Sequence, residues 1–147
     1  MKNLIKFLFV GVVAILTFSF EAKAQVFSFL SPHSITSDTV TNTATVFLTS
    51  PKISNAPATS TTIWVAVTKI SGTVGGTITL QCSIDGTNWK AMNTPDTQTA
   101  LATITATDAT NTYHWRLSGS PFPYYRVSWT GTGTMAASFR AQIFRGK

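Results

Sequence analysis

The feature that most constrains the fold is the regular alternation of polar and apolar residues between Thr77 and Ile84. Every second residue of this segment is apolar, and the residues between them are polar. The apolar positions are Ile78, Leu80, Cys82 and Ile84. Because successive side chains of a β-strand point to opposite faces, this segment is predicted to be a strand with its apolar side chains in the core.

The same period of two recurs along most of the chain after residue 38. It is clearest in residues 39–48, 62–70, 113–117, 125–129 and 135–143. Residues 25–147 also hold 25 Thr and 13 Ser, and Thr favours strands over helices. We therefore expect an all-β protein, an antiparallel β-sandwich or jelly-roll-like domain of about seven to eight short strands.

The N-terminus has the form of a secretory signal. Lys2 and Lys6 precede an uncharged, largely apolar run of 14 residues, Phe7–Phe20, whereas a membrane-spanning helix needs about 20. Ala22-Lys23-Ala24 has the small-x-small pattern of a cleavage site, so we expect a signal-like helix in residues 1–24 and a mature chain that begins at Gln25. A retained anchor is the alternative, and contact with a membrane is expected only through an uncleaved leader.

This division predicts three parts: a signal peptide in residues 1–24, an N-terminal arm or linker in 25–38, and a β-sandwich domain in 39–147. The segment 25–38 mixes aromatic residues with Pro32 and several serines, so a first edge strand is a further alternative for it. The 123 residues after the leader fit one domain with a substantial core. The expected location is the periplasm, the cell surface, the medium or a virion.

Charge and cysteine content narrow the functional classes. Without the leader the chain has eight basic and four acidic side chains, a net charge of +4. The basic residues are dispersed rather than clustered, which argues against a nucleic-acid partner. Cys82 is the only cysteine, so it cannot form an intrachain disulfide, and its alternating position predicts a buried core side chain.

The residues that could carry catalysis are few. Ser118, His114 and Asp108 could be combined into a hydrolytic triad, but the sequence around them has no nucleophile elbow and no oxyanion-hole motif. The acidic residues lie in or beside expected turns, and His and Cys are too few for a zinc site. We therefore expect no catalytic residues, no metal and no cofactor.

Aromatic side chains are the better indication of function. Trp115 and Trp129 fall on apolar strand faces and are expected in the core. Trp64, Trp89 and Tyr124 are the candidate surface contacts, because Trp64 and Tyr124 lie opposite the apolar positions and Trp89 follows a turn. An exposed ring of this kind can stack on a sugar or anchor a protein interface.

Two motifs carry a resemblance to a known group of proteins. Residues 83–89 have the form Ser-x-Asp-Gly-Thr-x-Trp, and a late strand contains Tyr125-Arg126-Val127. In these features the chain resembles small β-sandwich structural and decoration proteins of tailed bacteriophages, which implies a virion-surface or fibre-associated role without enzymatic activity. Similar Asp-Gly-Thr-x-Trp turns also occur in secreted bacterial adhesion and sugar-binding sandwiches.

Two functional hypotheses follow. The first is a non-enzymatic virion-type structural or decoration protein that binds itself, as a homo-oligomer, or other virion or surface proteins through strand edges and Thr-rich faces. The alternative is an exported bacterial cell-surface adhesin or carbohydrate-binding module with a glycan as its partner.

Overall fold

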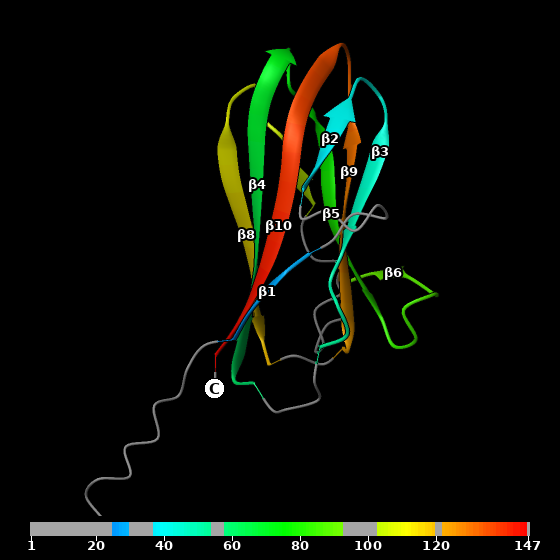
Figure 1. Cartoon of the computed structure of the whole chain (residues 1–147), viewed down its shortest axis with the longest axis vertical. Helices are drawn as coiled ribbons and strands as arrows, with labels where there is room; N and C mark the ends of the chain where they lie inside the picture. Colours follow the sequence, from blue (N-terminus) through cyan, green and yellow to red (C-terminus); the bar gives the residue numbers. More distant parts are fainter. Residues whose placement is uncertain (1–24, 30–36, 54–57, 93–102, 120–121, 147) are drawn as a thin grey trace, which may run out of the picture.

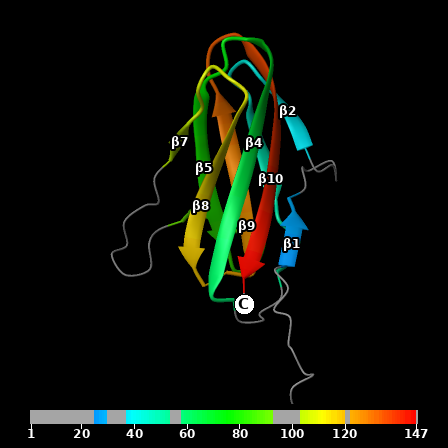
Figure 2. The same ribbon diagram turned by 90° about the vertical axis from the view of Figure 1, so that its left-hand side faces the viewer.

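The computed structural model describes residues 25–29, 37–53, 58–92, 103–119 and 122–146. These residues form two antiparallel sheets that pack face to face, as the two views in Figures 1 and 2 show. The predicted all-β sandwich is confirmed, although the described residues form ten strands rather than seven or eight. No helix occurs among them, and the helix expected in residues 1–24 lies outside the described ranges.

The first sheet, sheet A, is built around its longest strands, which are β10 (Met135–Gly146) and β4 (Ser60–Gly72). β8 (Asn111–Ser118) pairs with the free side of β4. On the other side of β10, β1 (Gln25–Ser28) pairs with its second half and β2 (Ser37–Thr41) with its first half. Gln25–Ser28 is therefore an edge strand, one of the alternatives left open for residues 25–38.

The second sheet, sheet B, has β9 (Tyr124–Gly131) between β3 (Thr45–Thr49) and β5 (Gly76–Ser83). Two short strands, β6 (Lys90–Ala91) and β7 (Ile104–Thr105), pair with different parts of the other side of β5.

The core lies between the sheets and follows the alternation in the sequence. In β10 the buried apolar side chains are those of Met135, Ala137, Phe139, Ala141 and Ile143. Trp129 of sheet B is fully buried and meets the ring of Phe139 of sheet A edge to face, with 5.4 Å between the ring centroids. Its indole Nε1 donates a hydrogen bond to the carbonyl oxygen of Gly75 at 3.3 Å. The expected burial of Trp115 and Trp129, and that of Cys82, is confirmed.

Two details of the predicted strands are wrong. The continuous strand region expected from Thr39 to Leu48 is two strands, because the chain turns at Asn42, which has a φ of 50°, and passes from sheet A to sheet B. Ile84 was expected in the core with its alternating neighbours, but it is 77% exposed. The reason is that β5 ends at Ser83 and the chain enters a turn, where the alternation of faces no longer holds.

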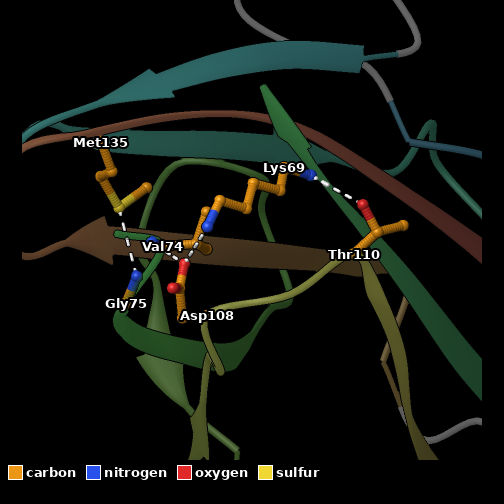
Figure 3. Close-up of polar contacts among 6 residues, drawn as sticks. All are labelled: Lys69, Val74, Gly75, Asp108, Thr110 and Met135. Carbon is orange, nitrogen blue, oxygen red and sulfur yellow. Dashed lines mark hydrogen bonds and ion pairs between the residues drawn. The ribbon is translucent and has the colours of Figure 1, made fainter. Parts of the chain in front are cut away.

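Asp108 ties together the loops at one end of the sandwich (Figure 3). Its Oδ1 lies 2.7 Å from Nζ of Lys69 and accepts a hydrogen bond from the backbone N–H of Val74, also at 2.7 Å. The backbone N–H of Lys69 donates to Oγ1 of Thr110 at 3.0 Å. Since Lys69 lies in β4 and Val74 just before β5, this carboxylate links the connection between the sheets to the segment that leads into β8.

The Lys69 ammonium group and the Val74 N–H hold the pKa of Asp108 below its ordinary range. A carboxyl group with a lowered pKa in the folded state stabilises the fold above its unfolded pKa of about 3.9, and this contribution disappears as pH falls through the folded value.

We expect Asp108→Asn to lower the free energy of unfolding at pH 7, with a difference from wild type that shrinks below about pH 4. Urea unfolding at several pH values measures this.

The control is Asp38→Asn, because the Asp38 carboxylate accepts a hydrogen bond from the N–H of the adjacent Thr39 and so joins no distant segments. It should have the smaller effect at pH 7. A difference between Asp108→Asn and wild type that is the same at pH 7 and pH 3 would contradict the assigned role of the ion pair.

Candidate functional site

The candidate site lies on the outward face of sheet B. In the strand register, Arg126 of β9 is opposite Thr49 of β3 on one side and Gln81 of β5 on the other. Phe47 of β3 is opposite Ser128, two residues further along β9, and therefore points to the same face as Arg126. Three neighbouring strands thus place an aromatic ring, a cation and an amide next to each other.

The guanidinium group of Arg126 lies over two aromatic rings. Its central carbon lies 4.4 Å from the centroid of the Phe47 ring and 4.5 Å from that of the Trp89 ring. Its Nε donates a hydrogen bond to Oε1 of Gln81 at 2.8 Å. Cation–π attraction and this hydrogen bond both restrict the side chain. We call Phe47, Gln81, Trp89 and Arg126 the arginine clamp.

All four side chains of the arginine clamp are half-buried, so each keeps part of its surface in contact with solvent. Partial burial lowers the pKa of Arg126 from its ordinary value. An arginine side chain nevertheless stays protonated in proteins, so this face presents a positive charge at neutral pH.

The turn Ser83–Trp89 brings Trp89 to Arg126. Oδ1 of Asp85 accepts hydrogen bonds from the backbone N–H groups of Thr87 and Asn88 and from the hydroxyl of Ser83, each at 2.8 Å. Oδ2 accepts a further one from the Asn88 side chain at 2.6 Å. These donors favour the charged carboxylate and hold the pKa of Asp85 well below its ordinary range. The charged aspartate therefore fixes the turn that ends at Trp89.

Tyr124 supports the same turn from β9. Gly86 has a φ of +77°, a conformation that favours glycine, and a Cβ atom there would lie 3.4 Å from the Tyr124 ring. The Tyr124 ring thus lies against the backbone of the turn. The Asp-Gly-Thr-x-Trp turn and Arg126 of the Tyr-Arg-Val strand meet on this face, whereas Tyr125 and Val127 are buried in the core.

The three candidate contact residues do not form a single site. Trp89 and Tyr124 both lie at the outward face of sheet B, on either side of the same turn. Trp64 belongs to β4 of sheet A, where its ring is 5.9 Å from the guanidinium carbon of Arg140. The sandwich core separates it from the other two, so it belongs to a different surface.

Sequence reasoning missed Phe47, Gln81 and Arg126 as candidate contacts. Alternation predicts that all three side chains point outward, because each lies between apolar residues of its strand. Phe47 lies between Val46 and Leu48, and Gln81 between Leu80 and Cys82. Arg126 lies between Tyr125 and Val127. Alternation does not give the register between strands, and this register determines which outward side chains are neighbours.

The hypothetical triad of Ser118, His114 and Asp108 does not come together. Ser118 and His114 are exposed and lie four residues apart on β8, about 13 Å along the strand. The Asp108 carboxylate is bonded to Lys69 and Val74 instead.

Within the described ranges there is no group of three or more His, Cys, Asp or Glu side chains that could hold a metal. Those ranges also contain no helix long and apolar enough to span a membrane.

Comparison with known proteins gives distant structural similarity alone. No family model matches the chain, and no curated protein matches it. Among solved structures it is similar to the enzymatically active domain of bacteriophage CBA120 tailspike protein 4, with 8% identity, a TM-score of 0.47 and coverage of 87% of this chain and 20% of that one. It is also similar to the C-terminal family 22 carbohydrate-binding module of Clostridium thermocellum Xyn10B, with 12% identity, a TM-score of 0.43 and coverage of 88% and 89%.

A third similar structure is that of Bacillus endospore appendages, described as disulfide-linked pili, with 11% identity, a TM-score of 0.37 and coverage of 82% and 89%. This chain spans only about a fifth of the tailspike domain but most of the other two proteins. At such identities and TM-scores the similarity carries no argument about function, which must come from the site itself.

We expect Asp85→Ala to release Trp89 from Arg126, because the turn then loses the acceptor for four hydrogen bonds. The guanidinium group of Arg126 lies close to two aromatic rings in the wild type, so its Nε–H NMR resonance should move toward the position typical of an unstacked arginine. A ¹H–¹⁵N correlation spectrum measures this shift.

Thr87→Ala is the matched control, since Thr87 contributes its backbone N–H to Asp85 and that group is retained in alanine. Its Arg126 resonance should stay at the wild-type position. An unmoved Arg126 resonance in Asp85→Ala would show that the turn does not position Trp89.

Proposed function

We propose that this chain is a non-enzymatic, exported binding module that takes a glycan on the outward face of sheet B. The observation that carries the proposal is the arginine clamp, supported at its edge by Tyr124. Export to the periplasm, the cell surface or the medium is part of the proposal and rests on the signal-like residues 1–24.

The chemistry of this face suits a sugar. A sugar ring presents C–H groups on its faces and hydroxyl groups around its edge, so it is bound well by an aromatic surface with a few polar groups beside it. The two rings of the arginine clamp can contact the C–H faces of a sugar. The Gln81 amide and the Arg126 guanidinium can form hydrogen bonds with its hydroxyl groups.

The face is also organised before any ligand arrives. Arg126 is restrained by two rings and an amide, and Trp89 follows a turn fixed by Asp85. Side chains that are already ordered lose less conformational entropy on binding, which favours affinity.

We expect Trp89→Ala to weaken glycan binding at least about tenfold, equivalent to about 1.4 kcal/mol, because it removes one ring of the clamp and releases Arg126. The matched control is Trp64→Ala, which removes a half-buried tryptophan near an arginine on the opposite sheet and should change affinity less than about twofold.

The measurement is affinity electrophoresis followed by calorimetry, with xylan, mannan, mixed-linkage β-glucan, polygalacturonate and alginate. Circular dichroism verifies that both variants are folded. Binding lost in Trp64→Ala and kept in Trp89→Ala would move the site to sheet A, and wild-type protein that binds none of these polysaccharides would contradict the proposal.

A virion-type structural role is the second candidate, and the specific observation in its favour is the edge of sheet A. β8 ends the strand order of that sheet in the described part of the chain, where it pairs with β4 alone. The free edge of a strand can pair with an edge of another copy.

On this second candidate we expect self-association. The average mass from light scattering should rise with protein concentration, because pairing between copies follows mass action. A mass equal to that of the monomer across about a hundredfold range of concentration would count against a structural assembly role and leave the binding module as the better proposal.

A further inference from the structure

We infer that the ligand of the arginine clamp is an acidic glycan, whose uronic-acid carboxylate binds the outer edge of the Arg126 guanidinium group. This inference rests on the proposed glycan-binding function and narrows its ligand class.

None of the acidic side chains in the described ranges forms an ion pair with Arg126. Asp108 forms its ion pair with Lys69, and Asp38 lies in β2 of the opposite sheet. Asp85 is in the same hairpin as Trp89, but its two oxygens accept four hydrogen bonds from that hairpin. Across the described ranges, the one hydrogen bond of the Arg126 side chain goes to the neutral amide of Gln81.

Among the described side chains, the half-buried guanidinium group of Arg126 has no carboxylate partner. Removing part of the water around the guanidinium disfavours its charged form, which is why burial lowers the pKa of Arg126. The two rings and the Gln81 amide offset part of this cost, but none of them carries a negative charge. An anionic group that arrives with the ligand would supply the missing charge.

The geometry of the arginine clamp selects the shape of that group. The guanidinium carbon lies 4.4 Å from the Phe47 ring centroid and 4.5 Å from that of Trp89, and the Gln81 amide oxygen accepts the N–H of Nε. Within the described ranges no hydrogen bond is formed by Nη1 or Nη2, and the parallel N–H groups of this edge match the two oxygens of a carboxylate. A sugar carboxylate bound there would place its ring next to Trp89, where stacking is available.

The experiment compares acidic polysaccharides with neutral counterparts of the same backbone. Polygalacturonate, alginate and hyaluronan are each tested against their carboxyl-reduced forms by calorimetry at low salt. For at least one pair, we expect the acidic form to bind at least about tenfold more tightly than the reduced form. Raising the salt from about 20 to 200 mM should weaken the acidic interaction, because salt screens exposed charges.

Two matched variants test the role of Arg126. Arg126→Lys keeps the positive charge but loses the two parallel N–H groups, so the preference for the acidic form should fall at least about fivefold. Arg140→Lys makes the same change at the other arginine that lies over a tryptophan, on sheet A, and should leave the preference unchanged.

The outcomes separate the two proposals. If a reduced or neutral polysaccharide binds as tightly as its acidic form, and Trp89→Ala still removes binding, the carboxylate inference is wrong and the glycan-binding proposal stands. If sulfated dextran binds but none of the uronic polysaccharides does, the anion is a sulfate and the carboxylate inference is again wrong. If no glycan binds, both proposals fall.

Discussion

The burial of one face of each sheet against the other is the constraint on which the rest of the structure depends. Its centre is the contact of Trp129 with Phe139, one ring from each sheet. Because both side chains are fully buried, alternation along β9 and β10 then turns Arg126 and Arg140 outward on opposite surfaces. Core packing thus decides which side chains are available to a partner.

The two outward faces use the same pair of residue types in different ways. On sheet A the Arg140 guanidinium lies 5.9 Å from the Trp64 ring, a loose contact. On sheet B the Arg126 guanidinium carbon lies 4.5 Å from the Trp89 ring and 4.4 Å from the Phe47 ring, and Nε is bonded to Gln81. Because Arg126 interacts with three side chains and Arg140 with one tryptophan, sheet B is the better candidate for recognition.

The turn after β5 serves both fold and site. The Asp85 carboxylate accepts hydrogen bonds from backbone N–H groups of the turn that would otherwise lack partners. The Tyr124 ring packs against Gly86 of the same turn. The same turn carries Trp89 over Arg126. A motif that encodes a stable hairpin can therefore recur in proteins of different function, because only the side chains around its tryptophan make a particular surface.

The alternation of the sequence predicted the fold class and the direction of most side chains, because a period of two is a local property of a strand. It therefore predicted the buried Trp115 and Trp129 and the exposed side of β9. Tertiary structure alone decided that the chain changes sheets at Asn42, that Trp64 is remote from Trp89, and that Phe47, Gln81 and Arg126 are neighbours. These depend on pairing between strands distant in sequence, and a period of two leaves that register open.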